Sequence, residues 1–291
     1  MRIGVIFPCN EIGADVGAIR AYAQAAEDLG YDHFEVFDHV VGEPSNYAGR
    51  LWREPFVLLS YLAAFTERIE LTTGIVILPQ RQTALAAKQA ADLDMLSDGR
   101  LRLGLGVGWN PFEYVALDQD FHTRGRRMDE QIAALRVLWS EQVVDVDVET
   151  GNERVHGGGI LPVPEREIPV WIGGRSPAAL RRAVEHQGWL SNFQDHLAND
   201  RDEYLAAHQQ LLAAAGGELP AGFGIESWTS PARTDRATWA AEATEWASLG
   251  VTHLSLRTDE SRMAEAGPAK TVDEHISLLT SYAAEVGLEA G

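Results

Sequence analysis

The segment IGVIFPCNEIGADVGAIRAYAQAAEDLGYDHFEVF, residues 3–37, contains two short apolar runs separated by a longer amphipathic stretch. The runs at 3–7 and 33–37 have the length and composition of buried β-strands. Residues 16–29 carry apolar side chains at helical spacing, and Asp15 precedes them as an N-cap residue. The segment therefore predicts a strand, a helix and a second strand parallel to the first.

The same alternation continues to the end of the chain. Six further strands are predicted at residues 69–78, 101–108, 169–174, 188–193, 223–228 and 251–257. Helices are predicted between and after the strands, at residues 54–66, 83–97, 126–139, 177–187, 201–214, 237–249 and 272–286. Eight consecutive strand–helix units predict a (β/α)8 TIM barrel with insertions, in one α/β domain spanning residues 1–291. The alternative is a doubly wound open sheet, which normally has fewer strands.

One segment, residues 143–168, interrupts this alternation. Polar and apolar residues alternate in it on both sides of Thr150-Gly151-Asn152, which is the pattern of a β-hairpin. We therefore expect a hairpin-like insertion between the fourth and fifth strand–helix units.

The composition restricts the classes of partner. The formal net charge of −19 repels nucleic acids and anionic membranes, so neither is expected as a partner. No apolar run approaches the roughly 20 residues of a membrane-spanning helix. The sequence has one cysteine, Cys9, and its first residues lack the pattern of a secretory signal. We therefore expect a cytoplasmic protein.

An acid and an imidazole, Asp38 and His39, directly follow the second predicted strand. Taken alone, this pair favours a polar turn. In a (β/α)8 barrel, however, active sites lie at the carboxyl ends of the strands. The predicted fold therefore makes both residues candidates for a functional site.

Glycines mark the third and fourth strands. Gly74 interrupts an apolar, β-branched run, which can mark a β-bulge or a point where a flat ligand meets the backbone. The alternative is an ordinary bend in the barrel. The fourth strand, LRLGLGVG, is followed by Trp109 and Asn110, so its glycines do not match a dinucleotide-binding fingerprint. These glycines either relieve crowding inside the barrel or leave room for a pocket with Trp109 as a wall.

The fifth strand ends in WIGGRSPAAL, residues 171–180. Gly173 and Gly174 let the backbone approach a ligand closely, Arg175 adds a positive charge, and Ser176 is a candidate N-cap residue. A glycine pair leading into a capped helix can bind an anion such as phosphate. The alternative is an ordinary tight turn between a strand and a helix.

The remaining clusters give weaker indications. The basic residues of FHTRGRRMDE, residues 121–130, have Asp129 and Glu130 as neighbours, which favours a structural role over phosphate binding. Trp228 ends the seventh strand and is a candidate lining residue. The nine histidines match no metal-binding spacing, and the sequence contains no nucleophile elbow or Walker A loop.

Five segments, in this order and spacing, resemble the bacterial luciferase-like superfamily of flavin and deazaflavin oxidoreductases. They are FDHV (37–40), TTGIVILPQR (72–81), LSDGRLRLGLGVGWN (96–110), FHTRGRRMDEQIAALRVLW (121–139) and IPVWIGGRSPAALRRA (168–183). The Asp-His pair that closes the second strand is most similar to the branch that uses the deazaflavin coenzyme F420. Close relatives use FMN with oxygen, so FMN is the alternative cofactor.

The resemblance implies a TIM barrel and, position by position, a coenzyme site. Asp38 and His39 would lie beside the reactive part of the coenzyme ring, and Gly74-Ile75 would form a bulge behind it with a non-proline cis peptide bond. The ring and substrate would be bordered by Gly108, Trp109 and Asn110. The phosphate-bearing tail would contact Gly173, Gly174, Arg175 and Ser176.

The sequence departs from one subgroup of that branch. Its sugar-phosphate dehydrogenases have a proton-donating glutamate directly after the glycines of the fourth strand. Here Trp109, Asn110 and Pro111 follow, and Glu113 is not at the matching position. The chain also has only two lysines, Lys88 and Lys270, to hold a sugar phosphate. We therefore expect a less charged substrate.

The function implied by the resemblance is hydride transfer between F420 and a small organic substrate. We expect His39 to exchange the proton, because an imidazole titrates near neutral pH, and Asp38 to orient it or to contact the coenzyme. One alternative is an FMN-dependent monooxygenase supplied with reduced flavin by a partner reductase. Another is a non-catalytic flavin-binding protein. Analogy with the family also implies a homodimer.

Overall fold

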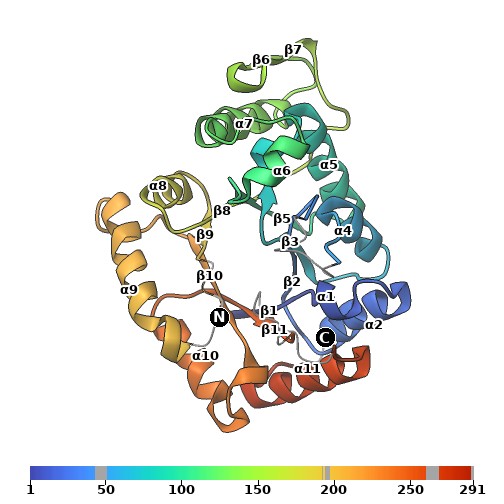
Figure 1. Cartoon of the computed structure of the whole chain (residues 1–291), viewed down its shortest axis with the longest axis vertical. Coiled ribbons are helices and arrows are strands. Elements are labelled where there is room, and N and C mark those ends of the chain that lie inside the picture. Colours follow the sequence, from blue (N-terminus) through green and yellow to red (C-terminus); the bar gives the residue numbers. More distant parts are fainter. Residues whose placement is uncertain (43–50, 192, 194–196, 260–268, 290–291) are drawn as a thin grey trace.

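The computed structural model describes residues 1–42, 51–191, 193, 197–259 and 269–289. Its parallel sheet closes on itself, because the strand order is β3-β2-β1-β11-β10-β9-β8-β5 and β3 also pairs with β5 (Figure 1). The predicted TIM barrel is confirmed and the open sheet is wrong. The barrel strands are β1 (Arg2–Ile6), β2 (His33–Val36), β3 (Glu70–Thr73), β5 (Leu101–Gly106), β8 (Val170–Gly173), β9 (Gly188–Leu190), β10 (Gly224–Thr229) and β11 (His253–Arg257).

Helices surround the barrel (Figure 1). The first long helix begins where the sequence predicts it, because the side chain of Asp15 accepts hydrogen bonds from the amides of Gly17 and Ala18. The described helices are α1 (Cys9–Ile12), α2 (Val16–Asp28), α4 (Pro55–Ala63), α5 (Thr83–Leu96), α6 (Pro111–Ala116), α7 (Arg124–Leu138), α8 (Pro177–Glu185), α9 (Leu197–Ala214), α10 (Trp239–Ser248) and α11 (Val272–Val286). Helices α1 and α6 were not predicted.

The predicted third strand, residues 69–78, is broken into β3 and a short strand β4 (Val76–Ile77). Thr72 pairs with Arg102, and Val76 pairs with Leu105. Between these pairs the segment from β3 to β4 therefore has one residue more than β5. This extra residue is a β-bulge, and it lies where the sequence predicts one. The expected cis bond is wrong: within the described residues the cis peptide bond is Leu161–Pro162, and the bulge forms with a trans bond between Gly74 and Ile75.

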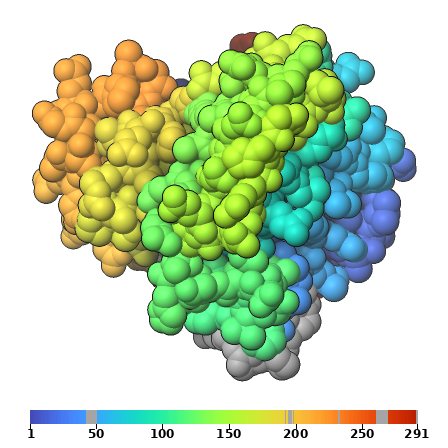
Figure 2. All heavy atoms as spheres, turned by 90° about the horizontal axis from the view of Figure 1, so that it is seen from above, coloured from blue at the N-terminus to red at the C-terminus, as the bar shows by residue number. Residues whose placement is uncertain are grey.

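The predicted hairpin is confirmed. Strands β6 (Val144–Val148) and β7 (Glu153–Gly158) pair in antiparallel fashion, and Asn152 in the turn adopts a left-handed conformation. The hairpin packs on helix α7 and lies at the surface beside it (Figure 2). It is attached to the outside of the barrel and adds no strand to the barrel sheet.

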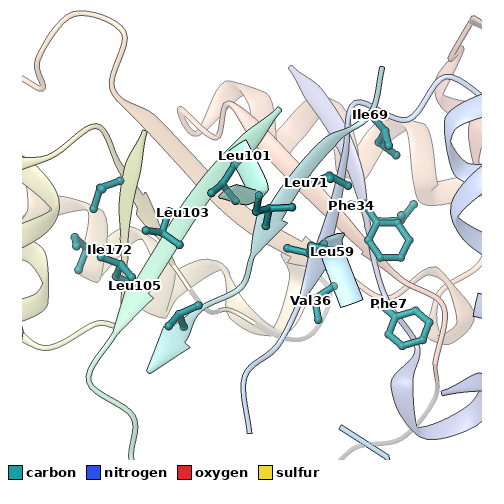
Figure 3. Packing of buried hydrophobic residues seen from close by; sticks show 14 of the residues in the cluster. Phe7, Phe34, Val36, Leu59, Ile69, Leu71, Leu101, Leu103, Leu105 and Ile172 are labelled. Atoms are coloured by element: carbon teal, nitrogen blue, oxygen red, sulfur yellow. The ribbon is translucent and has the colours of Figure 1, made fainter. Parts of the chain in front are cut away.

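The main apolar core lies between the barrel and its helices. Alternate residues of β2 and β5, such as Phe34 and Leu103, point outward to this layer, where Leu59 of α4 also packs (Figure 3). Residues of the barrel strands that point inward include polar ones: Arg102 of β5, Glu226 of β10 and Ser255 of β11 are fully or almost fully buried. Among the described helices, none is both long and apolar enough to cross a membrane.

Candidate active site

The candidate residues come from four strands that are neighbours in the barrel, β2, β3, β5 and β8. All strands of the barrel are parallel, so their carboxyl ends form one rim. Asp38 and His39 follow β2, Gly74-Ile75 follows β3, Gly108-Trp109-Asn110 follows β5, and Gly173 to Ser176 end and follow β8. The structure therefore brings these segments, which are far apart in sequence, to the same rim.

His39 is oriented by a buried carboxylate. Its Nδ1 atom lies 3.2 Å from Oε2 of Glu113, and Oε1 of Glu113 accepts a hydrogen bond of 2.9 Å from the amide of Val40. Glu113 is fully buried on α6, the short helix that Asn110 caps by accepting a hydrogen bond from the amide of Phe112. Glu113 thus reaches the rim although it does not directly follow the fourth-strand glycines.

Aromatic rings surround His39. The ring of Trp52 lies 4.8 Å from the imidazole, and that of Trp109 lies 6.3 Å from it in an edge-on arrangement. Trp228 of β10 packs against Phe37 with a centroid distance of 5.1 Å, so it reaches the same rim from the other side of β2. Trp109 is 49% exposed, which leaves an indole surface accessible to a flat ligand.

Asp38 has a different set of partners from the one expected. Its Oδ1 accepts a hydrogen bond of 2.7 Å from Arg81, and its Oδ2 accepts one of 2.8 Å from the amide of Ile77. Arg81 also pairs with Glu54 at 2.8 Å, and these carboxylates raise the pKa of the guanidinium although burial opposes them. The contact that orients His39 therefore comes from Glu113, and Asp38 fastens the end of β2 to the turn after the bulge.

Ile75, the residue of the bulge after Gly74, lies across two strands. A Cβ atom added to Gly106 would lie 2.5 Å from Cδ1 of Ile75, and one added to Gly173 would lie 2.6 Å from its Cγ2. A Cβ atom at Gly108, whose φ is +63°, would likewise lie 2.7 Å from Ile77. Of the two explanations for the glycines of the fourth strand, relief of crowding is therefore correct at these positions.

The turn after β8 has the predicted cap. Ser176 accepts a hydrogen bond of 3.2 Å from the amide of Ala179, and Gly174 has a φ of +116°, which favours glycine. Arg175 pairs with Glu203 at 3.0 Å, and both side chains are exposed. An exposed ion pair of this kind contributes little to stability. The guanidinium of Arg175 also lies over the ring of Phe193, 4.7 Å from its centroid.

The basic residues of 121–130 are engaged within the protein, in line with the structural role expected. Arg126 lies 3.5 Å from Glu130, and Arg127 forms a close ion pair with Glu153 of the hairpin. Asp129 pairs with Arg182 of α8. Among the residues that the structure describes, no group of three or more histidine, cysteine or acidic side chains could hold a metal ion.

A buried charge network fills the barrel below the rim. Arg102 donates to Glu226 at 2.5 Å and to Glu70 at 2.9 Å. Glu226 also accepts a hydrogen bond from Ser255 at 2.5 Å, and His33 lies 2.7 Å from the same hydroxyl. Although burial opposes it, the charge of Arg102 holds the pKa of Glu226 well below its ordinary value. Glu226 therefore stays ionised inside the barrel.

This fold and rim belong to a known family. Residues 1–286 match the sequence profile of the luciferase-like monooxygenase family. The chain is a member of that family. Luciferase-like proteins include flavin-dependent and F420-dependent oxidoreductases and monooxygenases, so the rim is the candidate active site of an enzyme of this group.

Relatives of the chain include an F420-dependent dehydrogenase and a flavin-dependent monooxygenase. The chain is 26% identical over 291 residues to the F420-dependent hydroxymycolic acid dehydrogenase of Mycobacterium tuberculosis, an alignment covering 98% of this chain and 78% of that protein. Among solved structures, the monooxygenase RslO1 from Streptomyces bottropensis superposes with a TM-score of 0.78 at 20% identity. An F420-dependent secondary alcohol dehydrogenase, in complex with an F420–acetone adduct, superposes with a TM-score of 0.74 at 14% identity. Each superposition covers 98% of both chains and supports the shared fold.

Sequence reasoning missed three components of this luciferase-like site: Glu113, Arg81 and the interior ion pairs of Arg102. The dipeptide Asn110-Pro111 is the N-cap and N1 signal of a short helix and could have predicted α6, although not its contact with His39. For Arg81 the sequence held no local signal, because its partner Asp38 lies 43 residues away.

Proposed function

We propose that the chain is an F420-dependent oxidoreductase that transfers a hydride between the coenzyme and a small organic substrate at the barrel rim. The observation that carries the proposal is the His39–Glu113 pair among aromatic rings, beside the Ile75 bulge. The F420-dependent hydroxymycolic acid dehydrogenase supports the choice of coenzyme, because its alignment covers nearly the whole chain.

The rim residues fit a flat coenzyme with an anionic tail. Asn110 is buried, and its Nδ2 atom has no hydrogen-bond partner among the described residues, so it can donate to a ring carbonyl. Trp109 offers an exposed ring face, and Arg175 lies beside the N-terminus of α8, where an anion is favoured. When bound, the deazaflavin ring supplies the hydride donor or acceptor.

In this proposal His39 is the proton-exchanging residue. Glu113 accepts from Nδ1, which makes Nε2 the basic nitrogen of a neutral imidazole and fixes the ring orientation. Because Glu113 is fully buried and also held by the amide of Val40, it acts as a rigid positioning residue. The ring of Trp52, 4.8 Å from the imidazole, shields one side of His39 from water.

Asp38 has a supporting part in the proposal. Both of its carboxylate oxygens accept hydrogen bonds, from Arg81 and from the amide of Ile77, so it holds the segment that carries His39. A direct contact between Asp38 and the coenzyme remains a prediction. Trp109 and Asn110, which follow β5 two strands away on the same rim, complete the proposed ring site.

The competing proposal is an FMN-dependent monooxygenase on the same rim, supplied with reduced flavin by a partner reductase. The name of the family and of several relatives favours it. The two functions differ in their need for oxygen, since a deazaflavin reacts poorly with oxygen. A non-catalytic flavin-binding protein would bind a coenzyme without exchanging a hydride with any substrate.

The test is an anaerobic assay with oxidised and reduced F420 against a panel of small alcohols, aldehydes and ketones, followed by coenzyme absorbance. We expect turnover with at least one substrate. His39→Ala should bind F420 normally but lose about a hundredfold in rate. The exposed hairpin variant His156→Ala is the matched control and should be unchanged. Full turnover by His39→Ala would refute the role of His39, and oxygen-dependent turnover with reduced FMN alone would establish the monooxygenase.

A further inference from the structure

Glu35 is a buried acid that the proposed chemistry does not use. It lies on β2, where its neighbours in register are Ile6 of β1 and Thr72 of β3. The side chain is fully buried, and its carboxyl group lies beside Glu226 and Ser255 without a hydrogen bond of normal geometry to either, or to any other described residue. A buried carboxyl group without partners is costly in its charged form, so its position calls for an explanation.

The carboxyl group of Glu35 lies against the bulge that supports the rim. A Cβ atom added to Gly74 would lie 1.8 Å from Oε1 of Glu35, so the carboxyl group occupies the space that any other residue at position 74 would fill. The next residue, Ile75, packs across Gly106 and Gly173. Glu35 therefore lies directly beneath Gly74 and Ile75, the residues that are predicted to lie behind the coenzyme ring.

The surroundings of Glu35 favour its neutral form. Burial is the larger cause, and the negative charge of Glu226 on β10 is the second; together they raise the pKa of Glu35 well above its ordinary value. Arg102 on β5 and Ser255 on β11 act in the opposite direction but are already bound to Glu226. The other charged or titratable groups near this cluster include Arg257 and His253 on β11, Glu70 on β3 and His33 on β2.

We propose that Glu35 is a positioning residue: its neutral carboxyl group supports the Gly74-Ile75 bulge from inside the barrel. The coenzyme ring would lie on this bulge, which we call the coenzyme platform. This inference rests on the proposed function, because it requires a coenzyme at the rim. Ionisation of Glu35 would place a second negative charge beside Glu226, and the repulsion between the two carboxylates would displace the Glu35 side chain from its contact with Gly74. The bulge would shift, and the platform for the ring would be lost.

The proposal predicts that coenzyme affinity depends on pH because Glu35 ionises. If only the protein with neutral Glu35 binds, affinity for F420 falls about tenfold for each pH unit above the pKa of Glu35. Glu35→Gln keeps the shape of the side chain and cannot ionise. Its affinity should therefore stay within about twofold across the same range.

The experiment titrates F420, and separately FMN, into wild type, Glu35→Gln and the exposed-hairpin control Glu149→Gln, from about pH 6 to about pH 10. Wild type and control should lose affinity in parallel as the pH rises, while Glu35→Gln should not. Infrared difference spectra of wild type against Glu35→Gln should contain the band of a protonated carboxyl group at neutral pH. If Glu35→Gln does not fold, Glu35→Leu replaces it as a second non-ionisable variant of similar size.

The outcomes separate the two proposals. Parallel pH profiles for wild type and the non-ionisable variants, or the absence of the protonated band, would overturn the role of Glu35 and leave the proposed function in place. Failure of wild type to bind either coenzyme at the lowest pH would overturn the proposed function and, with it, the platform that Glu35 is proposed to support.

Discussion

Replacing Glu226 by glutamine should destabilise the protein far more than an ordinary surface change. Glu226 is fully buried inside the barrel, and its carboxylate is the partner of Arg102 at 2.5 Å. The variant keeps the volume of the side chain but removes its charge. Arg102 is itself buried and, among the described residues, would retain only Glu70, at 2.9 Å, as a charged partner.

The magnitude follows from the cost of leaving a buried charge incompletely paired. Removing one partner of a buried ion pair typically lowers the free energy of unfolding by roughly 3–5 kcal/mol. Because Glu70 remains and the glutamine amide can still accept a hydrogen bond from Arg102, we expect the lower end, about 3 kcal/mol. That loss is a large fraction of a typical domain stability of about 5–15 kcal/mol.

The assay is urea unfolding at pH 7, with Glu70→Gln as the matched control. Glu70 binds the same guanidinium, but its side chain is 19% exposed, so water can replace part of the interaction. We expect the control to lose about 1 kcal/mol. A loss below about 1 kcal/mol for Glu226→Gln, or a larger loss for the control, would refute the view that a fixed interior charge at position 226 organises the barrel.

Three further predictions use the same structure. Glu113→Gln should lower turnover about tenfold to a hundredfold without changing coenzyme affinity, because it loosens His39 without removing it; stopped-flow rates and titrations check this. Arg81→Met should cost about 3 kcal/mol in urea unfolding, because it leaves the buried carboxylate of Asp38 without its charged partner. Burial and the nearby charges of Arg102 and His33 lower the pKa of His253 from 6.5 to about 2. Below pH 6.5 the unfolded chain therefore binds a proton that the folded protein does not, so at about pH 4.5 roughly 3 kcal/mol of stability should be lost, and His253→Asn should abolish this loss.

The barrel could be predicted because its signals are local. Each strand–helix unit carries its own periodicity, and the caps at Asp15 and Ser176 act on amides two or three residues away. The hairpin was predictable for the same reason. The division of residues 69–78 into two strands was harder to predict, because the bulge is defined by pairing with β5, some 30 residues further along the chain.

For the site, the sequence could predict only which segments lie at the rim, because that follows from the direction of the strands. Knowing that the strands are parallel places the candidates after β2, β3, β5 and β8 on one rim. It does not say which side chains meet there. His39 and Glu113 are 74 residues apart, and Arg102 and Glu226 are 124 residues apart, so their pairing depends on how the barrel closes.

The central claim is that this rim binds a tricyclic redox coenzyme. The most direct test is equilibrium titration of the purified protein with F420 and with FMN, following the quenching of coenzyme fluorescence. We predict saturable binding of F420 with one coenzyme per chain, and weaker binding when Trp109 is replaced by alanine. Saturable binding of FMN alone would contradict the proposed coenzyme, and the absence of binding by both would contradict the claim itself.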